Sequence, residues 1–327
     1  MLLRDAVAMF LAARRHIVAR QTWRNNEIYL RYLTEFFPNT CMADVTLHDL
    51  RRWRASLFEK NCKYERMRGT GNHTKRKAVR AKLSPYTIRG IVENCRQLFN
   101  WLVNEGLLQE SPAKRLELPA LPDAPPKMMA EDDLEKLIEA ARKLSGRYRR
   151  ARNVALLLFI RDTGCRIGGA STLRFEHLDL ERGRAWVTEK GRGGGKTRAV
   201  FLKDEAIAAL REWIALHPKN KKRRVLKTKR MSRTAREFVF VSERYPFAPL
   251  ATHSIYDVFR SLKKKARVKG RVNPHGLRHR RAKTMLENGA PLGLVSQVLG
   301  HADIRTTHKS YGVYVVNELQ AGFNKYA

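Results

Sequence analysis

The chain has 327 residues, 43% of them hydrophobic, which is long and apolar enough for two folded domains and excludes a disordered chain. Its 66 Lys and Arg residues outnumber 31 Asp and Glu residues, and the formal net charge of +35 favours a polyanionic partner. These basic residues are spread along the whole chain, which favours nucleic acid over an anionic membrane surface, and no apolar run is long enough to cross a bilayer.

Local patterns at the start of the chain, and its cysteines, predict an intracellular protein. Residues 1–16 alternate charged and apolar residues at helical spacing, unlike the unbroken apolar core of a secretory signal. The cysteines show no C-x-x-C spacing, which argues against a zinc knuckle or a disulfide framework. We expect four reduced thiols in a cytoplasmic protein: Cys41, Cys62, Cys95 and Cys165.

Residues 1–118 predict a helical domain, because apolar residues recur there at helical spacing. Four helical segments are expected: 2–20, 22–37, 47–60 and 84–105. Thr22, Thr46 and Ser84 are candidate N-caps for the last three segments. Pro85 follows Ser84 at the first helical position, which proline favours.

A segment rich in Lys and Arg, 60–82, interrupts this domain and is too polar to be buried. Two interpretations remain open: a solvated loop, or an arm that contacts phosphates and becomes ordered on DNA. Further along, repeated prolines exclude both a helix and a central strand. We therefore place a semi-extended linker at 119–127, between a first domain at 1–118 and a second at 128–327.

The second domain predicts helices together with a small sheet. Four helical segments are expected: 132–141, 149–163, 204–217 and 252–265. Three short strands are expected, the first two joined by a glycine-rich hairpin: 184–189, 198–201 and 237–242. We interpret the dense basic run at 219–236 as a loop that follows a phosphate backbone. The fold class is therefore mainly α with a small β-sheet (α+β).

The last quarter of the chain carries the residues of strongest chemical character. His275 and Arg278 stand three residues apart after Pro274, so in a helix that begins at the proline they share one face. A guanidinium group suits two non-bridging phosphate oxygens, and an imidazole can carry a proton near neutral pH. A helix hairpin would bring His301 back to them. Tyr311 follows in a polar segment, where we expect it to be mobile and accessible.

Other interpretations of these residues need weighing. His275 and His279 have the i, i+4 spacing of a helical metal pair, but Arg278 stands between them and its charge repels a dication. Tyr311, taken alone, would more commonly be a partly buried aromatic with a satisfied hydroxyl. We expect no metal and no cofactor, since the chain has no glycine-rich nucleotide loop and no carboxylate cluster.

Several motifs together resemble the tyrosine recombinases, the phage-integrase-like family. The C-terminal part reads H-x-x-R-H at 275–279, L-G-H at 299–301 and T-T-x-x-x-Y at 306–311. Upstream, T-G-C-R at 163–166 and a lysine in the glycine-rich hairpin stand where the family has its other two catalytic positions. The resemblance implies six catalytic residues: Arg166, Lys190, His275, Arg278, His301 and Tyr311.

The resemblance also implies a fold and an activity. The N-terminal part would be a helical, SAM-like core-binding domain on DNA, and 128–327 the catalytic domain. Tyr311 would attack a phosphodiester with help from His275, and form a 3′-phosphotyrosyl link without metal or ATP. Arg166, Arg278 and His301 would stabilise the phosphate, and Lys190 would protonate the leaving 5′-oxygen.

The partners that the resemblance implies are all connected with DNA. The substrate would be double-stranded DNA at specific recombination sites, bound by a homo-tetramer, with DNA-bending accessory proteins as further partners. No membrane partner is expected. The protein would be cytoplasmic and associated with the nucleoid.

Two features depart from the family pattern. Gly169 stands three residues after Arg166, where the family usually has an acid, and Glu176 is a candidate substitute. Tyr314 is a rival to Tyr311 as nucleophile, although Tyr311 follows T-T-H-K-S directly. Two alternatives therefore stay open: a catalytically weakened DNA-binding protein with the integrase fold, and a nicking and sealing enzyme similar to type IB topoisomerases.

Overall fold

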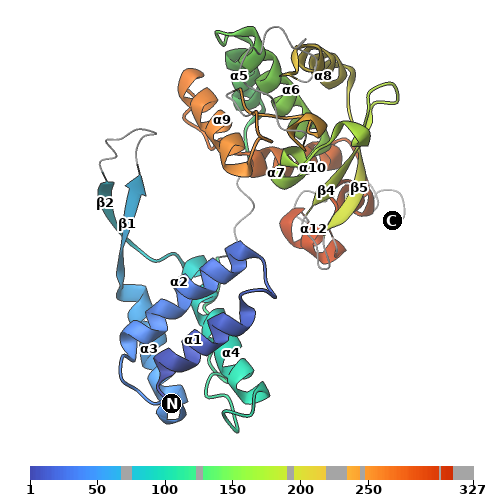
Figure 1. Cartoon of the computed structure of the whole chain (residues 1–327). Helices are drawn as coiled ribbons and strands as arrows, with labels where there is room; N and C mark the ends of the chain where they lie inside the picture. Colours follow the sequence, from blue (N-terminus) through green and yellow to red (C-terminus); the bar gives the residue numbers. More distant parts are fainter. Residues whose placement is uncertain are drawn as a thin grey trace, which may run out of the picture. The chain divides into compact units, whose positions relative to one another are not determined.

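A computed structural model of the chain describes residues 1–67, 76–122, 128–189, 195–218, 234–243, 247–301 and 303–311. The chain divides into two compact units, Met1–Asp123 and Ala124–Ala327, drawn in Figure 1. The division falls within the proline-rich segment 119–127. Among the residues described, no helix is both long and apolar enough to span a membrane.

Four helices and a hairpin make up the first unit. The helices are α1 (Leu3–Arg14), α2 (Arg20–Phe36), α3 (Leu47–Glu59) and α4 (Pro85–Asn104). The longest, α4, packs against the other three, and its buried face runs from Ile88 to Leu102. Phe10, Leu33 and Trp53 come from the three other helices into the same core. Amphipathic spacing thus produced the expected helical bundle.

Two of the three predicted N-caps are confirmed. Thr46 and Asp49 form a capping box, in which each side chain accepts the other residue's backbone N–H. Ser84 accepts the N–H of Thr87 ahead of Pro85, which is the first residue of α4. The prediction for Thr22 is wrong, because α2 already begins at Arg20 and Thr22 lies inside it.

The segment 60–82 is not the loop that its polarity suggested. Strands β1 (Asn61–Met67) and β2 (Arg76–Lys82) pair antiparallel, from Asn61 opposite Lys82 to Met67 opposite Arg76. Pairing gives the backbone N–H and C=O groups of this polar segment hydrogen-bond partners. The residues between the strands, 68–75, lie outside the described part.

The second unit is built around α6 (Arg147–Thr163), which is buried on nearly all sides from Ala151 onward. The helices around it are α5 (Glu131–Arg142), α7 (Ile167–Ser171), α8 (Asp204–Leu216) and α9 (Thr252–Lys265). The antiparallel sheet, in the order of its strands, is β3 (Leu178–Asp179), β4 (Arg184–Glu189) and β5 (Lys196–Phe201). Because α6 contacts α5, α7, α8 and β5, it fixes the position of the elements that follow it.

The predicted strand at 237–242 is wrong, and β3 was not predicted. Residues Thr234–Glu237 form a 3₁₀ turn, and the stretch after it makes only isolated bridges, Arg174 with Phe238 and Val241 with Pro249. Its side chains are nevertheless buried, as the apolar run indicated: Val239, Phe240 and Val241. The basic run at 219–236 lies outside the described residues up to position 233.

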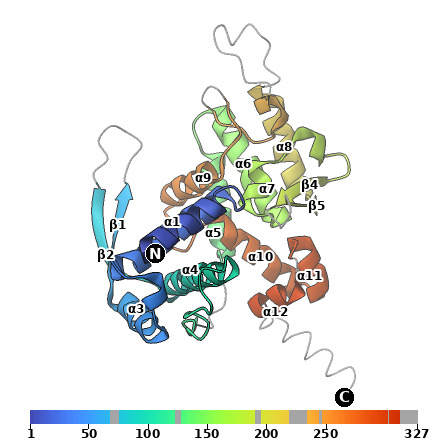
Figure 2. The ribbon, with the colours of Figure 1, turned by 60° about the horizontal axis from the view of Figure 1, so that its bottom comes forward.

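Three helices close the second unit: α10 (Pro274–Glu287), α11 (Leu292–Leu299) and α12 (Ile304–Tyr311). Figure 2 shows them grouped together, with α11 folded back beside α10. Asn273 caps α10, and α11 ends at Gly300 in the left-handed conformation, φ +68°. Leu286, Val295 and Leu299 form their shared core with Tyr311. The expected fold class, mainly helical with a small sheet, is confirmed.

The caps of the first unit give a matched stability test. Thr46→Ala removes the capping box, so the free energy of unfolding should fall by about 1 kcal/mol. Thr22→Ala is the control, because Thr22 is exposed within α2, where alanine is the better helix former and stability should rise by up to ~0.5 kcal/mol. Urea denaturation followed by circular dichroism measures both. Equal losses in the two variants would contradict the assignment of the caps.

Candidate active site

A left-handed turn after α6 positions Arg166. Gly164 ends the helix at φ +55°, and a side chain there would be crowded by Arg281 and Leu299, each 3.2 Å from an added Cβ. The Thr163 hydroxyl donates back to the carbonyl of Phe159 and accepts the N–H of Cys165. The T-G-C-R motif is therefore a rigid turn that ends with Arg166 at the start of α7.

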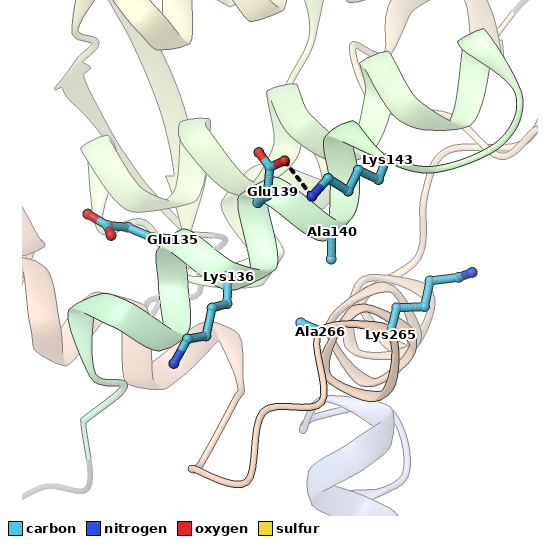
Figure 3. A pocket seen from close by; sticks show the side chains of 7 residues that line it. All are labelled: Glu135, Lys136, Glu139, Ala140, Lys143, Lys265 and Ala266. Carbon is cyan, nitrogen blue, oxygen red and sulfur yellow. Dashed lines mark ion pairs between the residues drawn. The ribbon is translucent and has the colours of Figure 1, made fainter.

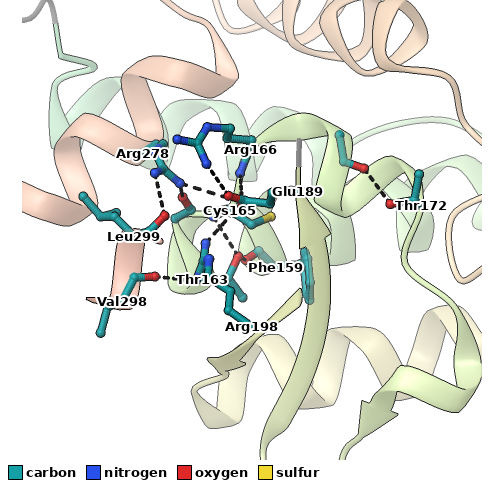
Figure 4. Close-up of polar contacts among 12 residues, drawn as sticks. Phe159, Thr163, Cys165, Arg166, Thr172, Glu189, Arg198, Arg278, Val298 and Leu299 are labelled. Carbon is teal, nitrogen blue, oxygen red and sulfur yellow. Dashed lines mark hydrogen bonds and ion pairs between the residues drawn. The ribbon is translucent and has the colours of Figure 1, made fainter. Parts of the chain in front are cut away.

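Three guanidinium groups surround one buried carboxylate, that of Glu189 at the end of β4 (Figure 4). Arg166 Nη1 lies 2.5 Å from Glu189 Oε2, and the Arg166 backbone N–H donates to Oε1 at 2.6 Å. Arg198 Nη2 lies 3.2 Å from Oε1, and Arg278 Nη1 lies 3.8 Å from it. We call Arg166, Arg198 and Arg278 the arginine cluster.

Backbone carbonyls hold two members of the arginine cluster from the other side. Arg278, which is 1% exposed, donates to the carbonyl of Gly164 at 2.8 Å and to that of Leu299 at 2.6 Å. Arg198 donates to the carbonyl of Val298. Arg166 differs from them, since 40% of its side chain is accessible.

The charges in the cluster change the proton affinities of its members. Burial alone would raise the pKa of Glu189, but Arg198, the backbone N–H of Arg166, Arg278 and Arg166 together hold this pKa below its ordinary value. Burial and the neighbouring charge of Arg166 lower the pKa of Arg278 to about 10. At neutral pH the carboxylate is ionised and Arg278 is charged.

The carboxylate that contacts the arginine cluster comes from the sheet and not from position 169 or from Glu176. Glu176 lies in the turn Phe175–His177, within 3.6 Å of Arg174, so the predicted substitute pairs elsewhere. Glu189 was missed, although a signal was present. Along β4, burial alternates, and Ala185, Val187 and Glu189 all point inward. A charged residue at an inward position of a strand indicates a partner in the core.

His279 bonds to the predicted nucleophile. Its Nδ1 lies 2.5 Å from the hydroxyl oxygen of Tyr311, and its ring is 4.3 Å from that of His275, centroid to centroid. The expectation that Tyr311 is accessible is wrong: it ends α12 and is 1% exposed. Its mobility stays a prediction. Thr307 and Tyr311, one turn apart, form the inward face of α12, so the polar segment is amphipathic.

The remaining predicted site residues divide into two groups. His301 follows α11 and its Nδ1 lies 2.6 Å from the Thr307 hydroxyl. His275 is exposed, and the positive charges of Arg278 and Arg166 lie close enough to act on it. Lys190 and Tyr314 lie outside the described residues. In the described part of the chain, no three His, Cys, Asp or Glu side chains come together as metal ligands.

A separate pocket of about 590 Å³ lies between α5 and the end of α9 (Figure 3). Lys136, Lys143 and Lys265 line it, and Lys143 pairs with Glu139 at 3.0 Å. None of the predicted catalytic residues lines this pocket. Its size therefore does not identify it as the reaction site.

Comparison with known proteins shows the family. Residues 127–314 match the Phage integrase family, so the chain belongs to that family. It is a tyrosine-type site-specific DNA recombinase, an enzyme of DNA strand exchange.

Relatives and solved structures agree with this family. Tyrosine recombinase XerD of Listeria innocua is 28% identical over 225 residues, 68% of this chain and 70% of XerD. Tyrosine recombinase XerC of Pediococcus pentosaceus is 25% identical over 305 residues, 92% and 88% of the two chains. The Tn1549 transposon integrase in complex with transposon right end DNA shares the fold, with a TM-score of 0.71 at 17% identity, covering 100% and 99%. A lambda integrase bound to a core site gives 0.67 at 13%, covering 95% of each chain.

The site histidines make stability depend on pH. Burial, followed by neighbouring positive charges, lowers the pKa of His279 and of His301 to about 4, from an ordinary value of 6.5. The unfolded chain therefore binds these protons at a higher pH than the folded protein does. The free energy of unfolding should fall as pH is lowered from 6.5 to about 4, and this contribution should level off below that.

His279→Gln should make this fall less steep, because it removes one of the site histidines whose pKa is lowered. Urea denaturation at half-unit pH steps measures the slope, and His253→Gln is the control, an exposed histidine on α9. Carboxylates titrate equally in all three proteins and cancel in the comparison. A wild-type slope in His279→Gln would contradict the proton uptake described for the site.

Proposed function

We propose that this recombinase cuts and rejoins duplex DNA through a covalent bond between Tyr311 and a 3′-phosphate, without metal or ATP. The observation that supports this most is that the arginine cluster lies in one unit with the hydrogen-bonded pair of His279 and Tyr311. A phosphodiester resists attack because it is anionic and its leaving alkoxide is a strong base. The site offers positive charge to neutralise the phosphodiester and proton carriers to protonate the leaving alkoxide.

The arginines stabilise the negative charge of the reacting phosphate. Three guanidinium groups and one carboxylate leave two net positive charges in a largely buried site. Fixed charges aimed at a developing phosphorane lower its energy by several kcal/mol where water is excluded. Arg166, which is accessible, makes the first phosphate contact, and Arg278 and His301 stabilise the charge that develops.

The histidines and Lys190 carry out the proton transfers. Tyr311 loses its proton to the His275 and His279 pair as it attacks in line, and His279 is the member that already holds the hydroxyl. Because Tyr311 is buried in the free protein, it must move to reach a phosphate. Lys190, in the hairpin after β4, protonates the departing 5′-oxygen. A 5′-hydroxyl from another strand then reverses the step, because the intermediate keeps the energy of the phosphoester.

Substitution of the tyrosine tests the chemistry. Tyr311→Phe keeps the aromatic ring and removes the attacking oxygen, so formation of the covalent adduct should be lost while duplex binding changes by less than about twofold. A nicked suicide substrate traps the adduct, which denaturing gel electrophoresis detects. Tyr314→Phe is the matched control and should form the adduct. The reverse result, loss in Tyr314→Phe alone, would identify Tyr314 as the nucleophile.

DNA binding uses both units in this proposal. The helical unit formed by 1–118 binds one face of the duplex and 128–327 the other, with 119–127 as the linker. The net charge of +35 supports a polyanionic partner, and the Tn1549 and lambda integrase structures are DNA complexes of those proteins. The hairpin of β1 and β2 and the basic run at 219–236 add sequence-independent phosphate contacts.

Recombination of two duplexes needs four cut strands, so we propose a homo-tetramer that assembles on paired sites. Free protein stays monomeric because its charge opposes association until DNA neutralises it. Residues 316–327, outside the described part, carry the contact between subunits. Their deletion should leave single-site binding intact and remove assemblies of paired sites in mass photometry. Undiminished tetramers on DNA would mean that the segment binds within its own subunit.

A further inference from the structure

We propose that Glu189 is the positioning carboxylate of this site, supplied by β4 in place of the acid that the family usually carries three residues after the first arginine. This inference rests on the proposed function, since it concerns how the catalytic arginines are held. Glu189 itself does not contact the reacting atoms. It acts by fixing Arg166 and the rest of the arginine cluster before DNA arrives.

The contacts of Glu189 are those of an organising residue. Each of its oxygens is used: Oε2 binds the Arg166 side chain, and Oε1 accepts the Arg166 backbone N–H at 2.6 Å and the Arg198 side chain at 3.2 Å. Its side chain is 4% accessible, so water does not compete for these bonds. A single carboxylate thus fixes both the main chain and the side chain of Arg166.

Gly169 is the steric counterpart of Glu189. A Cβ added at Gly169 would lie 3.4 Å from Glu189 Cγ and 3.2 Å from Val187 Cβ, with Cys165 Cβ next at 3.7 Å. The space that an acid at 169 would occupy is therefore filled by Glu189. Glycine at 169 and glutamate at 189 therefore belong together. The negative charge comes from a residue of the sheet, Glu189, instead of from a residue of α7.

Electrostatics explains why one carboxylate must be present. Three guanidinium groups at close range repel one another, and burial of unpaired charge is costly. One negative charge relieves that repulsion and leaves two positive charges for the phosphate. Loss of the carboxylate would let Arg166, the accessible member, turn away into solvent.

The first test removes the charge while keeping the shape. Glu189→Gln should slow single-turnover adduct formation on a suicide substrate by about 10- to 100-fold, the range found when a residue that orients metal ligands is lost. Its affinity for the duplex should stay equal or rise, because the site becomes more positive. Glu189→Asp keeps the charge and should lose less. Glu176→Gln is the matched control and should behave as wild type.

The second test moves the carboxylate. Glu189→Ala should be slow, and adding Gly169→Glu to it should recover at least tenfold of the lost rate, because the relocated acid reaches the vacated space. The double variant with Gly169→Gln in the Glu189→Ala background has the same bulk without the charge and should not recover. A purely structural role for Glu189 would predict equal results for Glu and Gln at 169. Rates are compared at a temperature below the melting temperature of every variant.

The outcomes separate this inference from the proposed function. If the wild-type protein forms the adduct at Tyr311 and Glu189→Gln forms it at the wild-type rate, the positioning role alone is overturned. Equal recovery of the rate by Gly169→Glu and Gly169→Gln in the Glu189→Ala background overturns it too. Absence of the adduct in the wild-type protein overturns the proposed function. The positioning role is then decided by NMR of the arginine side chains without DNA: the Arg166 Nη protons should be protected from exchange in wild type and lose protection in Glu189→Gln. Unchanged protection overturns it.

Discussion

The ion pairs of a single buried carboxylate hold the second unit's separate segments in one place. Glu189 is 5% exposed, and a charge at that depth is stable only when it is paired and hydrogen-bonded. Its partners come from the turn after α6, from β5 and from α10, which are distant in sequence. The pairing therefore requires the sheet, the turn and the C-terminal helices to be in their final positions together.

Two left-handed glycines make this convergence sterically feasible. The carbonyls of Gly164 and of Leu299, the residue before Gly300, accept hydrogen bonds from Arg278. Arg278 therefore joins the end of α6 to the end of α11. At Gly300 an added Cβ would lie 2.6 Å from Arg198 Cδ. The glycine of L-G-H therefore leaves room for the Arg198 side chain to reach Glu189. Motifs that are far apart in the sequence are thus parts of one packing arrangement.

Much of the fold could be predicted, because local signals decide it. Segment 252–265 became α9 and 184–189 became β4 with the predicted bounds, since each has one periodicity and clear ends. The pairing of β1 with β2 could not be predicted from polarity, because backbone pairing needs no apolar face. The segment 237–242 has strand composition, but among the residues described it forms only isolated bridges, Arg174 with Phe238 and Val241 with Pro249.

The contacts within the candidate site could not be read from the sequence, even where the structure brings predicted residues together. The family motifs gave Arg166 and Arg278, and the structure places both on Glu189. Glu189 itself was visible only through the alternation of β4, which a search for an acid near position 169 does not use. The bond between His279 and Tyr311 depends on how α12 packs against α10, which no local pattern encodes.

With Glu189 in the cluster, Gly169 no longer argues for a weakened enzyme. That departure was the one sequence feature behind the alternative of a DNA-binding protein with reduced catalysis. The described site holds one carboxylate among its arginines, that of Glu189, which the proposal above assigns to the role of the missing acid.

The burial of Tyr311 matters in a cell, where most of the DNA is not a target of the protein. A protein with this much positive charge spends most of its time on sequences that are not its target, sliding and hopping between them. The Tyr311 hydroxyl bonds to His279 and is shielded from solvent, so it is out of reach of DNA bound at such sequences. In the proposed mechanism, cleavage requires α12 to leave this core, so the packing that stabilises the fold also limits cleavage to sites that displace the helix.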